Sequence, residues 1–86
     1  MSGAMMLKHA ARVVTDRRGQ YGEPEVLFRR IAVRWSQTLD VPVTPAQVAL
    51  CLIDLKLARL AHDPTHTDSL VDVAGYVACL EEIVRP

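Results

Sequence analysis

The segment DRRGQYGEPE is the part of the sequence best suited to bind an anion. Arg17 and Arg18 stand near its start, and Gly19, Tyr21 and Gly22 follow. Glycines end regular structure and free backbone amides, while guanidinium groups match the geometry of phosphate oxygens. The segment is therefore either an ordinary connector between two helices or a loop that holds a phosphate. It is not a P-loop, because it lacks a Gly-Lys-Ser/Thr ending and a preceding strand.

A second group of charges lies in the other half of the chain. Lys56 and Arg59 are three residues apart on one side of an expected helix, and the next segment supplies Asp68 and Asp72. The connector between these segments has about six residues and is broken by Pro64, which makes the two helices antiparallel neighbours. We therefore expect the two basic side chains to face the two carboxylates.

Helical periodicity covers nearly the whole sequence and predicts an all-α fold. The expected helices span residues 4–15, 24–39, 44–61 and 68–83, and they form one compact four-helix domain over residues 1–86. The third helix is apolar on most sides, which is typical of a helix covered by its neighbours, so we expect it to be the central one. Its start predicts a capping box from Thr44 to Gln47, with Pro45 at the first helical position.

Two stripes of residues run along the fourth expected helix. The apolar stripe contains Leu70, Val73, Val77, Leu80 and Val84, and the second stripe contains Asp68, Asp72, Gly75, Tyr76 and Cys79. Glycine inside a helix costs about 1 kcal/mol relative to alanine. We therefore expect another backbone to approach Gly75 closely, either from the central helix or from a partner chain.

The sequence is more apolar than a small monomer needs. Half of its 86 residues are hydrophobic, whereas a chain of this length buries only about 60% of its extended surface when it folds alone. We therefore expect self-association into a homodimer or homotetramer. The formal net charge is zero and the basic residues do not gather on one recognition helix, which disfavours nucleic acid and anionic membranes as partners.

Cysteine usage and the absence of targeting signals favour a cytoplasmic protein. Cys51 and Cys79 fall in apolar helical patterns, so we expect free thiols that are buried as small hydrophobes. A zinc site is disfavoured, because Pro64 separates His62 from His66 and the cysteines lie far away in sequence. No stretch reaches the roughly 18 consecutive apolar residues of a membrane span, and the N-terminus has no signal-peptide pattern.

Four segments together carry a resemblance to a known family: RRGQYG, LFRRIAVRW, TPAQVAL with LKLARL, and HTDSLVDVAGY. In this order, over residues 16–80, they resemble a family of small phage and bacterial proteins of unknown function. The last segment is more distantly similar to the last metal-site helix of MazG-like, all-α nucleoside triphosphate pyrophosphohydrolases and of nucleotide-modification-associated phage proteins. That resemblance implies a helical oligomer in which acidic side chains hold magnesium against the phosphates of a nucleotide.

Carried over to this chain, the MazG-like resemblance implies a site for a nucleotide and magnesium. Asp68 and Asp72 are the implied magnesium ligands and, together with Lys56, the implied catalytic residues. The predicted substrate-binding residues are Arg18, Tyr21, Arg59 and Tyr76. Lys56 and Arg59 would offset phosphate charge during pyrophosphoryl cleavage.

The sequence departs from the MazG-like pattern in the second helix. Its segment EVLFRRIAVRW has no paired acids after Glu25, so only Glu23 or Glu25 could add a further carboxylate to the metal site. The functional prediction is therefore either a magnesium-dependent nucleoside triphosphate pyrophosphohydrolase or a degenerate relative that only binds nucleotide.

The alternative prediction is a non-enzymatic structural or regulatory oligomer of phage or prophage origin. In that case Asp68 caps the fourth helix and Asp72 pairs with Lys56 or Arg59 across the helix interface. Tyr76 then packs in the core, and the charged cluster only holds the bundle together.

Overall fold

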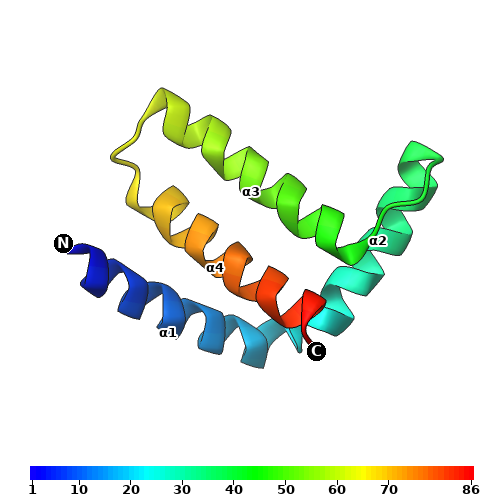
Figure 1. The fold of residues 1–86 in the computed structure, drawn as a ribbon, viewed down its shortest axis with the longest axis horizontal. Helices are drawn as coiled ribbons and strands as arrows, with labels where there is room; N and C mark the ends of the chain where they lie inside the picture. The colour runs from blue at the N-terminus through cyan, green and yellow to red at the C-terminus, as the bar shows by residue number, and fades with distance from the viewer.

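Four α-helices make up the chain in the computed structural model, which describes residues 1–86 (Figure 1). Helix α1 spans Gly3–Tyr21, α2 spans Pro24–Leu39, α3 spans Pro45–His62 and α4 spans Thr67–Val84. There is no strand. The predicted all-α fold of four helices is confirmed, and the bounds of α2, α3 and α4 lie within one residue of those expected from the sequence.

Helix α4, rather than α3, is the central helix of the fold. It packs against all of the other three helices, whereas α1 does not touch α3. In Figure 1, α4 lies between α1 and α3, antiparallel to α3, and α2 crosses one end of the group. The prediction of a central α3 is wrong because an apolar surface all round a helix does not reveal which sides are covered. Only Val48 and Ala49 of α3 are buried.

The core is small and lies where α2 crosses α3 and α4. Its fully packed side chains are Phe28, Ala32, Val48 and Ala49, and partly buried residues including Trp35 pack against them. The two α2 residues belong to the amphipathic stripe that the sequence predicts for this helix. Only 8 of the 86 residues are buried in the whole chain, so much apolar surface stays in contact with solvent.

Capping side chains define where α3 and α4 begin. Thr44 Oγ1 accepts a hydrogen bond from the Gln47 N–H at 3.1 Å, and Gln47 Oε1 accepts one from the Thr44 N–H at 2.9 Å, which confirms the predicted capping box. At α4, however, His66 Nδ1 accepts from the Ser69 N–H at 3.3 Å. The prediction that Asp68 caps this helix is therefore wrong, because α4 starts one residue earlier and places Asp68 inside its first turn.

Helix α1 continues through most of the glycine-containing segment that was expected to be a loop. It ends only at Gly22, whose φ of 84° favours glycine and whose N–H donates to the Arg18 carbonyl at 2.9 Å. Gly19 is helical and frees no backbone amide. The prediction of a loop over this segment is therefore wrong, and Arg17, Arg18 and Tyr21 project from the last turns of a helix instead.

The two cysteines lie on different helices, Cys51 on α3 and Cys79 on α4. Cys51 and Cys79 are free thiols, as predicted, but Cys51 is exposed and only Cys79 is half-buried.

None of the four helices combines the length and the apolar character needed to cross a membrane.

Candidate functional site

A cavity of about 250 Å³ lies where α1, α2 and α4 meet. Most of its wall is apolar, with Phe28 and Ile31 on the α2 side and Leu52 contributed by α3. Its polar wall residues come from two helices: Arg17, Arg18 and Tyr21 from the end of α1, and Asp72 and Tyr76 from α4. Two segments that are far apart in the sequence, RRGQYG and DSLVDVAGY, therefore line one cavity.

Four of the seven residues predicted to form a site line this cavity, namely Arg18, Tyr21, Asp72 and Tyr76. The other three, Lys56, Arg59 and Asp68, do not line it. Lys56 contacts the cavity indirectly through Asp72, whereas Arg59 and Asp68 are exposed. The fold brings Arg18 and Tyr21 of α1 together with Asp72 and Tyr76 of α4 and leaves the rest of the predicted cluster outside.

Helix α1 forms one wall of the cavity by packing against α4 at Gly75. A Cβ atom placed on Gly75 would lie 3.6 Å from Val14 Cγ2, which is an ordinary van der Waals distance. Within the chain, the neighbour of Gly75 is therefore α1 and not the expected α3. The sequence carried no signal for this, because the apolar pattern of α1 does not show which helix it meets.

Lys56 and Asp72 form an ion pair between α3 and α4. Lys56 Nζ lies 2.9 Å from Asp72 Oδ2, and the two side chains are only 13% and 23% exposed. This part of the predicted cluster is confirmed. Arg59 and Asp68 form no ion pair, so the prediction that they also face each other is wrong. The charge of Asp72 is offset by a lysine within the fold.

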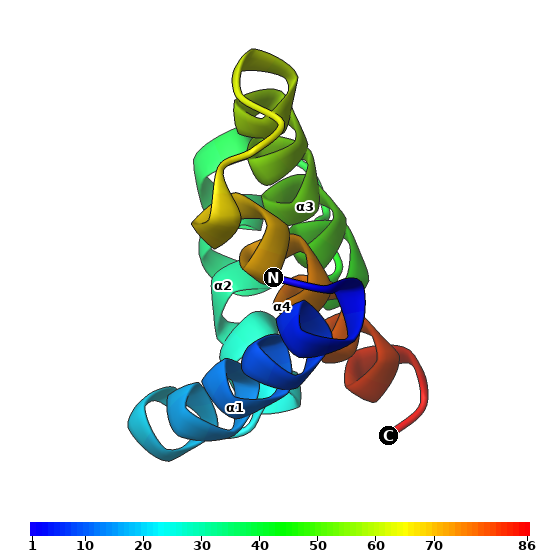
Figure 2. The ribbon, with the colours of Figure 1, turned by 90° about the vertical axis from the view of Figure 1, so that its left-hand side faces the viewer.

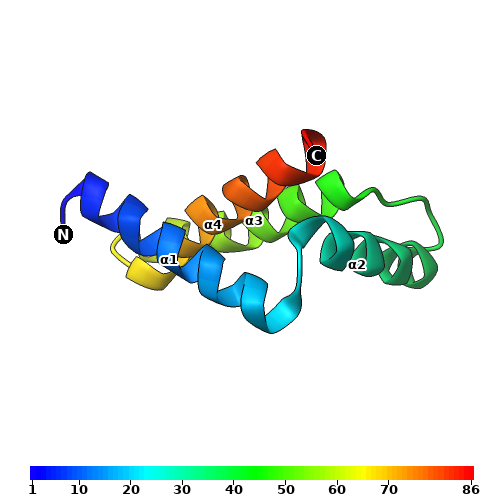
Figure 3. The ribbon, with the colours of Figure 1, turned by 90° about the horizontal axis from the view of Figure 1, so that it is seen from below.

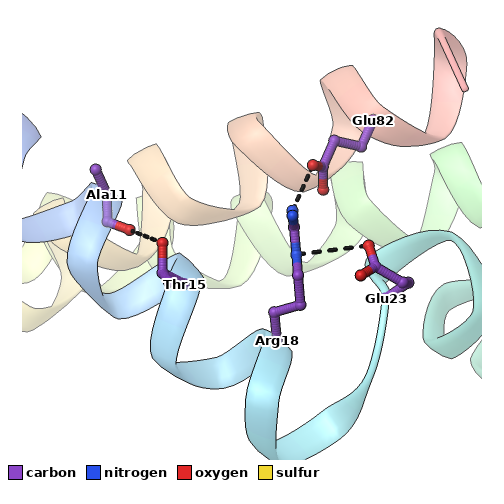
Figure 4. A network of polar contacts seen from close by, with 5 residues as sticks. All are labelled: Ala11, Thr15, Arg18, Glu23 and Glu82. Carbon is purple, nitrogen blue, oxygen red and sulfur yellow. Dashed lines mark hydrogen bonds and ion pairs between the residues drawn. The ribbon is translucent and has the colours of Figure 1, made fainter.

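Arg18 is held by two glutamates, as Figure 4 shows. It forms an ion pair with Glu82 of α4, and its Nε lies 3.5 Å from Glu23 Oε2 in the α1–α2 connector. The hydrogen bond from Arg18 to Glu82, with the charges of Glu23 and Glu82, raises the pKa of the Arg18 guanidinium. Arg18 thus ties the end of α1 to α4. Sequence reasoning missed Glu82 because nothing near it in the chain indicates its partner.

Arg17 differs from its neighbour because it has no acidic partner. It lines the cavity, is exposed, and takes part in none of the ion pairs of the chain. Of the two arginines in RRGQYG, Arg17 is therefore the one with a guanidinium free to meet an anion. The sequence offered both residues and could not separate them, because the choice depends on which side of α1 faces Glu82.

Cys79 lines the cavity beside these charges. Burial raises the pKa of its thiol, the negative charge of Glu82 raises it further, and the positive charge of Arg18 acts in the opposite direction. A thiol with a raised pKa is protonated near neutral pH. Cys79 therefore contributes a neutral, weakly polar wall to the cavity rather than a nucleophile.

The acidic side chains do not fit a magnesium centre held by the protein alone. No group of three or more His, Cys, Asp or Glu residues with the arrangement of a metal site occurs in the chain. Asp72 is paired with Lys56, and Glu23 and Glu25 are paired with Arg18 and Arg29. Asp68 lies outside the cavity.

The fold and the site define a small all-α domain with a largely apolar cavity that has a few charged groups in its wall. The model of the family described as "Domain of unknown function (DUF6378)" matches residues 5–84, and the chain belongs to this family. It is a phage-associated domain of unknown function, in agreement with the resemblance to small phage proteins. The more distant similarity to MazG-like enzymes stays a prediction.

Two phage proteins are among the relatives of the chain. The chain is 36% identical to the gene 55 protein of Mycobacterium phage L5 over 83 residues, which cover 94% of the chain and 53% of that protein. It is 35% identical to the gene 55 protein of Mycobacterium phage D29 over 79 residues, which cover 91% of the chain and 52% of that protein. The chain thus spans about half the length of these relatives. No solved structure matches the chain.

Proposed function

We propose that this domain binds a nucleotide, with the base in the cavity between α1, α2 and α4 and the phosphates toward Arg17. The observation that carries the proposal is the shared cavity of RRGQYG and DSLVDVAGY, which combines two tyrosines with an unpaired arginine. Apolar and aromatic walls suit a planar base, and a free guanidinium suits phosphate oxygens. The distant likeness of α4 to nucleotide-directed enzymes supports the same ligand class.

The size of the cavity favours a partly enclosed ligand. Small-molecule pockets typically have about 300–1,000 Å³, and this one has about 250 Å³. A base and part of its sugar fill such a volume, which leaves the phosphates at the rim. Arg17 lies at that rim on the last turns of α1, where phosphates keep access to water and to any magnesium ion that accompanies them.

Binding without hydrolysis is the better-supported form of the proposal. Pyrophosphate cleavage in the predicted manner needs carboxylates free to hold magnesium. Asp72 already offsets the charge of Lys56, and no further carboxylate joins it. A cytoplasmic location, where nucleotides are available, is part of the same proposal.

A structural or regulatory role is the second candidate. The observation that favours it is the Lys56–Asp72 pair, which links α3 to α4 without any ligand. The amount of exposed apolar surface favours it as well. In this case DSLVDVAGY serves packing, and the cavity stays without a specific ligand.

The test is a panel of canonical and modified nucleoside triphosphates, each with and without magnesium. We expect a nucleotide to raise the melting temperature and to give a saturable heat of binding, with no release of pyrophosphate. Arg17→Ala should weaken binding, whereas Arg34→Ala should not, because Arg34 is an exposed, unpaired arginine on α2 that does not line the cavity. Absence of any response across the panel would exclude nucleotide binding, and pyrophosphate release would restore the enzymatic prediction.

A further inference from the structure

Helices α3 and α4 carry an apolar face with nothing packed on it. Leu50 and Leu57 of α3 are 49% and 48% exposed, and Leu70, Val77 and Val84 of α4 are 38%, 51% and 49% exposed. We call these five residues the outer face. Exposed single leucines are common on any protein, whereas several that share one side of two adjacent helices indicate an interaction surface.

The outer face lies on the side of α3 and α4 away from α2. At about 100° per residue, Leu57 is roughly 140° around α3 from Leu52, which lines the cavity. Val77 is likewise about 140° around α4 from Asp72, another cavity residue. Figures 2 and 3 show α2 and the end of α1 on one side of the α3–α4 pair, and neither crosses to the opposite side.

The spacing of the outer face is that of helices packed in a bundle. Leu50 and Leu57 are seven residues apart, and so are Leu70, Val77 and Val84. Bundle seams alternate steps of three and four residues. The positions that complete these steps are also apolar and partly exposed, namely Ile53, Val73 and Leu80. A seam of this kind is the pattern of left-handed bundle packing, and it recurs here on two antiparallel helices of 18 residues each.

The chain as a whole exposes more surface than a monomer of its mass, by an amount comparable to one half of a dimer interface. A folded monomer of 9.5 kDa is expected to expose about 5,000 Å², whereas this chain exposes 6003 Å². The excess of roughly 1,000 Å² is close to the ~800 Å² that each partner contributes to a stable interface. The radius of gyration of 13.5 Å also exceeds the roughly 12 Å expected for 86 residues.

We infer that a second copy of this chain covers the outer face. The α3–α4 hairpin of one protomer packs on the same hairpin of its partner about a two-fold axis, which completes a four-helix bundle across the interface. The same patch then serves both protomers, as an isologous contact requires. The charged residue of α4 nearest to the outer face, Glu81, is already paired with Arg85 of the same chain, so the α4 side of the outer face offers no free charge to an oppositely charged partner. This inference goes beyond nucleotide binding and does not depend on it.

The test compares two leucines on the same helix. Leu57 and Leu55 are each 48% exposed, but they lie about 160° apart around α3, so only Leu57 belongs to the outer face. We expect the wild type to sediment as a dimer at micromolar concentration and Leu57→Glu to sediment as a monomer. Leu55→Glu should remain a dimer. Because both side chains already contact water, neither substitution should reduce the helix content.

Val77→Glu repeats the test on the second helix of the hairpin. It should also give a folded monomer, since Val77 is 51% exposed. A monomeric wild type would overturn the inference and leave the outer face to another occupant, such as a further segment or a different protein. A dimer that survives both Leu57→Glu and Val77→Glu would overturn it as well, as would a dimer lost equally in Leu55→Glu. Nucleotide titration of the variants reports on the cavity separately, so that failure of one proposal is distinguishable from failure of the other.

Discussion

Lys56 Nζ lies 2.9 Å from Asp72 Oδ2, and this contact joins α3 to α4 next to the cavity. Both side chains are mostly shielded from water, at 13% and 23% exposure. An ion pair in such a setting contributes little net stability, but removal of one partner leaves the other charge poorly solvated. Asp72 therefore stabilises the packing of α3 against α4, whether or not a ligand occupies the cavity.

Asp72→Asn should lower the free energy of unfolding by about 1–3 kcal/mol, because it leaves the Lys56 ammonium without its counter-charge. The full cost of about 3–5 kcal/mol for a completely buried pair is not expected, since water still reaches both side chains. Urea denaturation measures the difference. Asp54→Asn is the matched control: Asp54 is exposed on α3 and unpaired, so it should change stability by no more than about 0.5 kcal/mol.

Equal stability of the wild type and Asp72→Asn would contradict the claim that Asp72 stabilises the fold through its pair with Lys56. If the variant also lost a nucleotide- or magnesium-dependent rise in melting temperature, the carboxylate would belong to a ligand site instead.

Replacement of glycine by alanine should stabilise the protein at Gly19 and Gly75 and destabilise it at Gly22. Gly19 and Gly75 are helical, and a Cβ would meet nothing within 4 Å at Gly19 and only Val14 at 3.6 Å at Gly75. Each of these replacements should therefore raise stability by up to about 1 kcal/mol through helix propensity. Gly22→Ala should lower it by about 1 kcal/mol, because the φ of 84° disfavours a side chain. Thermal or urea unfolding of the three variants checks the signs, and a destabilised Gly75→Ala would mean that α1 and α4 approach more closely than the Val14 contact indicates.

Local patterns in the sequence predicted local structure well and packing poorly. The capping box of Thr44 and Gln47 and the amphipathic stripe through Phe28 and Ala32 depend on neighbours within a few residues, and both are confirmed. Gly19 was misjudged as a helix breaker, because a cost of about 1 kcal/mol is small beside the packing of a whole helix.

The candidate site was only partly predictable for the same reason. Lys56 and Asp72 flank a short connector, so their contact followed from chain geometry. The Arg18–Glu82 contact joins opposite ends of the chain and depends on which helix α1 meets. The apolar surface of α3 likewise could not show which of its sides the rest of the chain would cover.

The two cysteines should differ in reactivity. Cys51 is exposed, whereas burial and Glu82 raise the pKa of the half-buried Cys79 thiol. The native protein should therefore be alkylated faster at Cys51, which the single-cysteine variants Cys51→Ser and Cys79→Ser can measure near neutral pH. Under denaturing, non-reducing conditions the wild type should take up two labels. Uptake of no label would reveal a disulfide, and equal native rates would contradict the burial of Cys79.

The turn before α4 should show a defined acid dependence. Asp63 Oδ1 accepts hydrogen bonds from the Thr65 hydroxyl at 2.7 Å and from the Thr65 N–H at 3.0 Å. The hydroxyl is the larger cause, and together these donors lower the pKa of Asp63 below its ordinary value of 3.8. A depressed carboxyl pKa in the folded state gives stability that is present above the unfolded pKa and is lost as the pH falls through the folded one.

Removal of the Thr65 hydroxyl should therefore lower the stability of the protein near neutral pH but not in acid. Thr65→Ala should have a lower free energy of unfolding than the wild type at pH 7. This gap in free energy should narrow as the pH falls below about 4, because the Asp63 carboxylate that accepts the bond becomes protonated in both proteins. Urea denaturation at several pH values measures the gap. In an Asp63→Asn background the carboxylate is absent, so Thr65→Ala should have an effect that does not change over the same range. A gap that stayed constant in the wild-type background would show that the Thr65 hydroxyl does not stabilise the ionised form of Asp63.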